Sequence, residues 1–97
     1  MQQWRQVVAW KLDKSGMQVT QQLTPAEQEK FDIFQNAIQH QGVHPRIAAQ
    51  EAGDTNYTRL RGTNNQYEIR LSQGTRATFI VDDTEEICHI LQVGGHT

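Results

Sequence analysis

The chain has 97 residues, 36% of them hydrophobic and 21% charged, a composition that indicates a single small domain spanning residues 1–97. Its one cysteine, Cys88, excludes an intrachain disulfide framework and a zinc site built from several thiolates. The apolar runs are far shorter than the roughly 20 residues of a membrane span, and no basic segment followed by an apolar one opens the chain. We therefore expect a soluble, cytoplasmic protein without a signal peptide or membrane contact.

The formal net charge of −2 hides an uneven distribution. The segment from Tyr57 to Ala77 contains a single acid, Glu68, beside four arginines: Arg59, Arg61, Arg70 and Arg76. The segment from Asp82 to Glu86 contains four acids and no base. Because the chain as a whole has no positive field, binding of a polyanion must depend on a local group of arginines.

The N-terminal segment is predicted to form a β-hairpin. Trp4–Leu12 is rich in aromatic and branched residues, which favours a strand. Asp13–Gly16 has the composition of a turn, and Met17–Leu23 continues as a possible second strand.

Two helices are predicted next. Thr24 fits an N-cap, Pro25 the first helical position, and Glu27 closes a capping box. Apolar residues follow at helical spacing until Gly42 ends the helix; they are Phe31, Phe34 and Ile38, with Ile33 and Ala37 widening the stripe. A short second helix is expected from Pro45 to Ala52, ending at Gly53.

After Gly53 the hydrophobic period changes to two. Apolar residues alternate with polar ones in two segments, at Tyr67, Ile69 and Leu71 and again at Ala77, Phe79 and Val81. Ile87–Val93 is almost continuously apolar, as expected for a strand covered on both faces. The predicted fold class is α+β: a three- to four-stranded antiparallel meander with one or two helices packed on one face.

The register of the central hairpin brings two arginines together. A three-residue loop, Ser72-Gln73-Gly74 with left-handed glycine, places Leu71 opposite Thr75 and Arg70 opposite Arg76. This register also gathers the apolar residues on one face. Either both arginines are solvated and splayed apart, or one of them pairs with Glu68, or they form an anion site in which guanidiniums bind phosphate bidentately.

Histidine and cysteine give weaker signals. If Val81 pairs with Glu86, His89 lies opposite Thr78 on the face of the two arginines, although a histidine in an apolar strand is more often a hydrogen-bonded core residue. The histidines lack the spacing of a zinc pair on one predicted helix, and Cys88 is expected to be a small core residue. No metal site and no cofactor motif is predicted.

The second half of the chain resembles the RelE/ParE superfamily of small bacterial toxins, which includes HigB and YoeB. The resemblance covers about forty residues and rests on four ordered motifs: Arg59–Gly62, Tyr67–Leu71, Gly74–Asp82 and Ile90–His96. It implies a RelE-like fold and a metal-independent messenger-RNA endoribonuclease that acts at the ribosome and is held inactive by a cognate antitoxin. It further implies catalytic roles for Arg70, Arg76 and His96. We also expect Arg59, Arg61, Glu68 and His89 to contribute to substrate binding, and His96, Glu68 or His89 to supply proton transfer.

Three features depart from that pattern. Glu68 stands where a second basic residue is common, the net charge is negative, and no segment after Thr97 supplies the catalytic tyrosine of some members. The alternative is therefore a non-catalytic relative of the same fold, either gyrase-inhibitor-like or a protein-interaction module.

Overall fold

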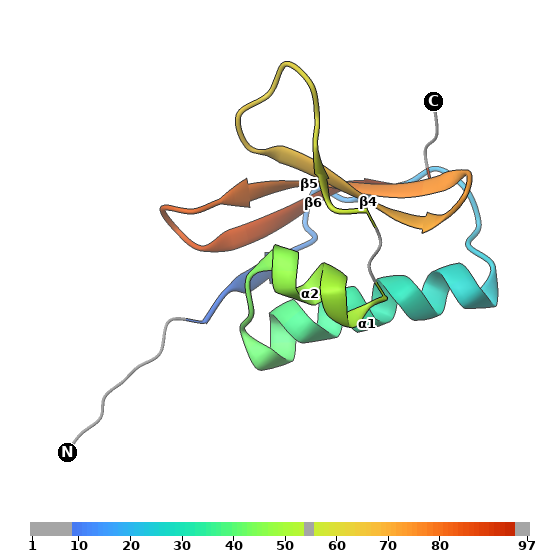
Figure 1. Ribbon diagram of the computed structural model, residues 1–97, viewed down its shortest axis with the longest axis horizontal. Helices are drawn as coiled ribbons and strands as arrows, with labels where there is room; N and C mark the ends of the chain where they lie inside the picture. The colour runs from blue at the N-terminus through green and yellow to red at the C-terminus, as the bar shows by residue number, and fades with distance from the viewer. Residues whose placement is uncertain (1–8, 54–55, 95–97) are drawn as a thin grey trace.

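The chain folds as an α+β structure, and the computed structural model describes residues 9–53 and 56–94. The elements in chain order are β1 (Lys11–Asp13), β2 (Gln18–Val19), α1 (Pro25–Gln41), α2 (Pro45–Glu51), β3 (Thr58–Arg59), β4 (Gln66–Ser72), β5 (Thr75–Asp82) and β6 (Ile87–Val93). The sheet has the order β1-β6-β5-β4-β3, and β2 also pairs with β6. Both helices lie on the same side of the sheet (Figure 1).

The core lies between this helical layer and one face of the sheet. Helix α1 contributes Phe31, Phe34 and Ile38, and the sheet contributes alternate residues such as Ile69 and Phe79. The rings of Phe34 and Phe79 are fully buried, with centroids 5.1 Å apart. The predicted helix stripe and the period-two pattern therefore meet in one core, as expected.

The predicted start and end of α1 are confirmed. Thr24 and Glu27 form a reciprocal capping box with Pro25 in the first turn, and Gly42 ends the helix at a φ of 70°. A Cβ at position 42 would lie 2.9 Å from that of Ala9, so this glycine is required by both conformation and space. The expected widening of the stripe by Ile33 is wrong, because that side chain is 37% exposed.

The capping box also joins the helix to the central hairpin. The Glu27 carboxylate accepts hydrogen bonds from the backbone of Thr24 and the hydroxyl of Ser72, at the end of β4. The Ser72 hydroxyl and then the Thr24 backbone N–H lower the pKa of Glu27 to about 2. The residue that closes the capping box, Glu27, thus also bonds the hairpin that carries Arg70 and Arg76.

The predicted N-terminal hairpin is wrong. β1 and β2 do not pair with each other; both run parallel to β6, with Asp13 beside His89 and Gln18 beside Gln92. The residues between them form a local bend in which Asp13 accepts from the backbone of Ser15, so the chain leaves β6 and returns in the same direction. Trp4–Val8 of the predicted strand lie outside the described residues.

The C-terminal half forms the predicted antiparallel meander, β4-β5-β6, with β3 as a short added edge strand. Burial alternates strictly along β5. The expectation that β6 is covered on both faces is wrong: Cys88, Ile90 and Val93 are buried, whereas the residues between them are partly exposed. Helices cover only one side of this strand, which leaves its other side open.

The hairpin register is confirmed where it matters for the arginines: Arg70 lies opposite Arg76 and Tyr67 opposite Phe79. The turn itself differs from the prediction. Ser72, not Leu71, pairs with Thr75, and the register shift between Arg70 and Ser72 absorbs the extra residue. Gly74 is not among the glycines with positive φ, because the tighter connection does not need a left-handed residue there.

The predicted partner of His89 is also wrong. His89 lies opposite Ile80 rather than Thr78, since the turn begins one residue later and pairs Asp82 with Ile87. The Asp82 side chain accepts from the backbone N–H groups of Thr84 and Glu85, which fixes this later turn. Opposite residues share a face, and Ile80 and Arg76 are an even number of residues apart, so His89 still shares the face of the arginines.

No helix within residues 9–53 and 56–94 is both long and apolar enough to cross a membrane.

Candidate functional site

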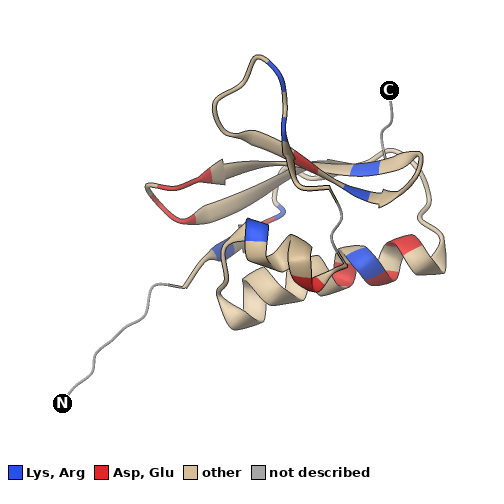
Figure 2. Ribbon diagram, in the orientation of Figure 1, with Lys and Arg blue, Asp and Glu red and all other residues tan. Residues whose placement is uncertain are grey.

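The face of the sheet turned away from the helices carries the predicted site. Ile69 and Ala77 point into the core, so Arg70 and Arg76, which follow or precede them, point to the opposite face. Figure 2 shows positive charge on this hairpin and negative charge on the β5–β6 turn at the other end of the sheet. The uncovered face therefore has a basic end and an acidic end.

The two arginines are not equivalent. Arg76 donates from Nη1 to Oε1 of Glu68 at 3.0 Å, and Glu68 is only 8% exposed. Among the described residues Arg70 makes no ion pair. The alternative in which Glu68 pairs with one arginine thus holds for Arg76, whereas the guanidinium of Arg70 remains available to bind an anion.

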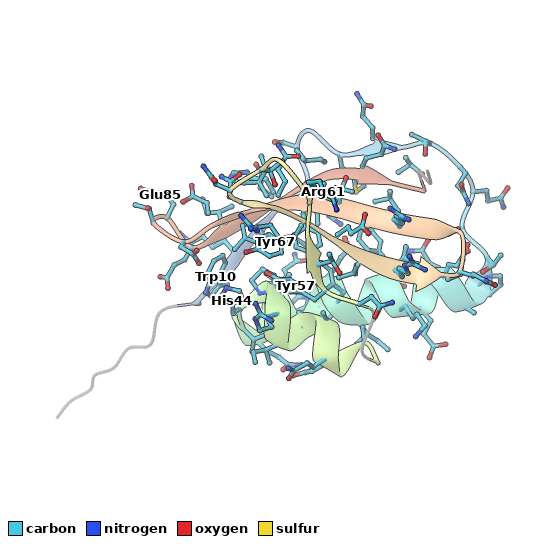
Figure 3. The ribbon with its side chains drawn as sticks, turned by 45° about the horizontal axis from the view of Figure 1, so that its top comes forward. Trp10, His44, Tyr57, Arg61, Tyr67 and Glu85 are labelled. Atoms are coloured by element: carbon cyan, nitrogen blue, oxygen red, sulfur yellow. The ribbon has the colours of Figure 1, made fainter. Side chains whose placement is uncertain are left out.

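The other two predicted arginines lie apart from this pair. Arg59 belongs to β3, and its Nη1 donates to the carbonyl of Thr63 at 3.0 Å. Arg61 is an exposed residue of the β3–β4 loop, which projects from the sheet on the side away from the helices (Figures 1 and 3). Arg59 lies opposite Tyr67, whose own partner across β5 is the buried Phe79, so the register places Arg59 on the other face of the sheet from Arg70 and Arg76.

The third predicted catalytic residue, His96, lies outside the described residues. The last described residue, Gly94, donates its N–H to the carbonyl of Arg76 at 2.8 Å. His96 follows two residues later in the chain.

A second group of ionisable side chains lies at the other end of this face. His89 Nδ1 is 2.7 Å from Oδ2 of Asp13, and Oδ1 of Asp13 accepts from the N–H of Ser15 at 2.9 Å. Hydrogen bonds from Ser15 and then His89 lower the pKa of Asp13 to about 2. Both side chains are about one-third exposed.

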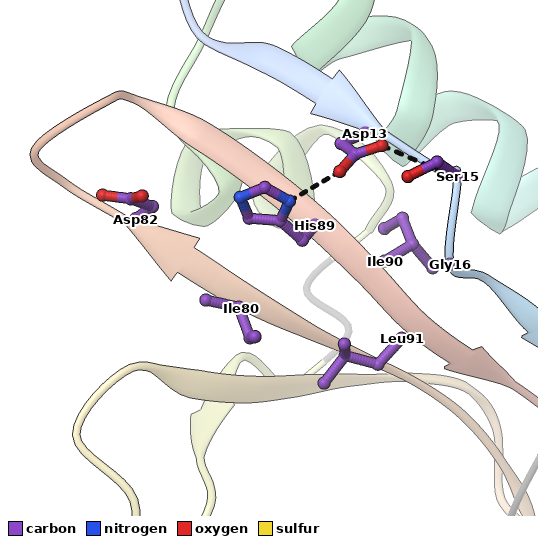
Figure 4. A pocket seen from close by; sticks show the side chains of 8 residues that line it. All are labelled: Asp13, Ser15, Gly16, Ile80, Asp82, His89, Ile90 and Leu91. Carbon is purple, nitrogen blue, oxygen red and sulfur yellow. Dashed lines mark hydrogen bonds and ion pairs between the residues drawn. The ribbon is translucent and has the colours of Figure 1, made fainter.

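The Asp13–His89 pair borders a hollow of about 420 Å³ (Figure 4). Ile80, Ile90 and Leu91 form its apolar part, and Asp82 contributes a second carboxylate. The sequence does not indicate Asp13 as a site residue, because Asp13–Gly16 has the composition of a turn. Only the parallel pairing of β1 with β6 brings it to His89.

A second His–Asp pair occurs elsewhere, where His44 Nε2 lies 3.6 Å from Oδ1 of Asp83. His44 also caps α2, since its Nδ1 accepts from the N–H of Arg46, and its ring meets Trp10 edge-on at 4.7 Å (Figure 3). Burial lowers the pKa of His44. Both ring nitrogens are thus engaged, which gives this histidine a structural role.

The remaining chemistry-bearing residues form no site. Cys88 is fully buried and burial raises the pKa of its thiol, in agreement with its predicted core role. Within the described ranges, no group of three or more histidine, cysteine, aspartate or glutamate side chains could hold a metal ion.

No protein-family model matches the chain, and no curated protein matches it.

Proposed function

We propose that this protein is a RelE/ParE-like toxin that cleaves messenger RNA at the ribosome without a metal ion. The observation that carries the proposal is the placement of Arg70 directly opposite Arg76 on the uncovered face of the sheet. Two like charges opposed on adjacent strands destabilise an empty sheet by a few tenths to about 1 kcal/mol. An anionic ligand between them offsets this repulsion.

The chemistry follows from the guanidinium group. Cleavage begins when the 2′-hydroxyl of a ribose attacks the adjacent phosphate, and negative charge grows on the equatorial oxygens. Arginine presents a planar fork of donors that matches those oxygens and keeps its charge at all physiological pH values. Arg70 is available for this contact, and Arg76 bonds Glu68 through Nη1, so that its other N–H groups can donate to the phosphate while the ion pair stays in place.

Glu68 has a positioning role in this proposal. Its carboxylate is largely buried and holds the Arg76 guanidinium at 3.0 Å. An arginine held in this way loses less side-chain freedom when a phosphate binds. The same carboxylate repels RNA once Arg76 is removed, so the two residues act as a unit.

The proposed partner is a cognate antitoxin, by analogy with the family. An acidic peptide laid over Arg70, Arg76 and the adjoining sheet would complement the basic end of the face and block access to RNA. The test is to co-express this protein with the products of the neighbouring genes and to purify it. Recovery of this protein alone would contradict the proposal of an antitoxin partner.

The competing function is a non-catalytic binding module, gyrase-inhibitor-like or protein-binding. The observation that favours it is the Arg76–Glu68 ion pair, which neutralises one of the two arginines within the protein itself. This alternative needs no contact between the arginines and a scissile phosphate, so it predicts that neutralising Arg70 leaves function intact.

The deciding experiment induces the protein in cells and, in parallel, adds it to translating ribosomes and maps the messenger-RNA ends. The wild type should arrest growth and cleave messenger RNA, and Arg70→Ala and Arg76→Ala should do neither. Arg70→Lys should recover activity in part, because lysine keeps the charge and loses the planar fork.

The matched control is Arg46→Ala, which removes an exposed guanidinium from α2, in the helical layer. It should arrest growth like the wild type. Growth arrest by Arg70→Ala without RNA cleavage would favour the binding module, and a wild type that neither arrests growth nor cleaves RNA would overturn the proposed function.

A further inference from the structure

We infer that His89, oriented by Asp13, is the general base that removes the 2′-hydroxyl proton in the proposed cleavage. This inference rests on the proposed function and selects His89 from the three residues expected from the sequence to supply proton transfer. It is carried by the geometry of the Asp13–His89 pair, by the hollow in front of it, and by the charge distribution along the uncovered face.

The pair has the arrangement of a base with its orienting carboxylate. A hydrogen bond of 2.7 Å between Nδ1 of His89 and Oδ2 of Asp13 favours the tautomer with hydrogen on Nδ1. Nε2 then carries the lone pair, and in Figure 4 that nitrogen points away from Asp13, toward the side of the hollow on which Asp82 lies. The Ser15 N–H holds the other oxygen of Asp13, so the carboxylate is itself fixed.

The hollow accepts an uncharged part of the substrate. The charged groups that line it with His89 are Asp13 from β1 and Asp82 from β5, and its remaining surface includes Ile80 and Leu91. Two carboxylates repel phosphate, whereas a ribose hydroxyl donates to Nε2 at no electrostatic cost. The face therefore orients an RNA strand, with phosphate at the arginine end and ribose at the histidine end.

The two ends lie within reach of one nucleotide. Arg76 bonds Glu68, which pairs with Thr78, so its guanidinium leans toward the Thr78 position. His89 pairs with Ile80, two residues further along β5. With about 3.3 Å per residue and about 4.8 Å between strands, the separation is about 7 Å along β5 and about two strand spacings across it. This separation, about 12 Å between backbone positions, must be closed in part by the side chains for a ribose and its 3′-phosphate to contact both ends.

The step balances without a further reactant. Nε2 of His89 takes the 2′-hydroxyl proton, the 2′-oxygen forms a bond to phosphorus, and the bond from phosphorus to the 5′-oxygen breaks. The 5′-oxygen takes a proton from solvent, which leaves a 2′,3′-cyclic phosphate and a 5′-hydroxyl. The Asp13 carboxylate stabilises the imidazolium that forms, as a positioning residue rather than a catalytic one.

The test measures the pH dependence of single-turnover messenger-RNA cleavage and, separately, binding of an RNA with a 2′-deoxy substitution at the cleavage site. His89→Ala should lower the cleavage rate by about 10²–10⁴-fold, leave RNA binding unchanged, and remove the limb of the profile that rises with pH. Asp13→Asn should lower the rate less and keep a rising limb. In the wild type, ¹⁵N spectra should show hydrogen on Nδ1 of a neutral His89.

The matched control is Asp83→Asn, which breaks the other His–Asp pair, that of His44. Its rate and pH profile should equal those of the wild type. Cleavage by His89→Ala at the wild-type rate, or a rising limb that persists in this variant and disappears in Glu68→Gln, would overturn the assignment of the base while the proposed function stands. Absence of cleavage by the wild type would overturn both.

Discussion

The two faces of the sheet differ in what their residues do. The face under the helices is apolar and closed, with Phe34 and Phe79 fully buried against each other. The uncovered face has charged residues in cross-strand pairs, Arg76 with Glu68 and His89 with Asp13. Burial of apolar area stabilises the fold but does not depend on the orientation of the groups. Partly exposed ion pairs add little stability, but they fix the orientation of the charged side chains. Substitutions on the two faces should therefore separate stability from activity.

The largest effect on stability is expected on the covered face. Phe34→Ala or Phe79→Ala should lower the free energy of unfolding by about 3–5 kcal/mol, because each removes a fully buried ring and leaves a cavity. Ile33→Ala, on the exposed side of the same helix, should change it by only about 0.5 kcal/mol. Chemical denaturation measures all three, and losses under about 1 kcal/mol at both phenylalanines would contradict the core.

On the uncovered face, Arg76→Ala should be the most destabilising arginine substitution. It leaves the Glu68 carboxylate, 8% exposed, without its charged partner, at a cost of about 1–3 kcal/mol. Adding Glu68→Gln should restore most of this loss, since the amide carries no charge. A double-mutant cycle followed by denaturation gives the coupling directly, and strict additivity of the two changes would show that the pair does not interact in solution.

The capping box comes next, because it connects the two faces at the end of the hairpin. Thr24→Ala should lower the free energy of unfolding by about 0.5–2 kcal/mol through loss of the side-chain acceptor for the Glu27 N–H. Thr84→Ala, at an exposed position of the β5–β6 turn, serves as a comparison for threonine removal, and an equal loss in both variants would contradict the assigned cap.

The contacts of Glu27 in the capping box also predict that the stability of the fold decreases at acid pH. The pKa of Glu27 is lowered from 4.5 to about 2 in the folded protein, so its contribution to stability is present above pH 4.5 and is lost as the pH falls toward 2. The melting temperature of the wild type should therefore fall over this interval by more than that of Glu27→Gln. Parallel melting curves of the two proteins down to pH 2 would contradict the contact.

The smallest effect on stability is expected at Arg70. Arg70→Ala removes one of two opposed like charges and breaks no ion pair, so stability should stay the same or rise by a few tenths of a kcal/mol. Activity should nevertheless be abolished, which is the clearest separation of the two properties in the molecule. Thermal melting and the growth assay on the same preparation measure both, and a stability loss with retained growth arrest would exclude the phosphate site.

Part of the site could be predicted because it depends on neighbours in the chain. Arg70 and Arg76 belong to one hairpin, and the alternation of Ile69 and Phe79 permits only the register that opposes them. The face of His89 was predicted for the same reason. Its partner residue was not, because the turn shifts by one residue when the Asp82 side chain caps the following N–H groups.

The sequence by itself determined the elements whose interactions are local: the Thr24 capping box, the stop at Gly42 and the hairpin that opposes the arginines. Only the tertiary structure decided that β1 and β2 lie parallel to β6, and therefore that Asp13 reaches His89 across 76 residues of sequence. A turn composition signals that the chain bends but not which strand it then joins. The pairing partner depends on β6, which comes last in the chain and offers β1 and β2 the edge that β5 does not occupy.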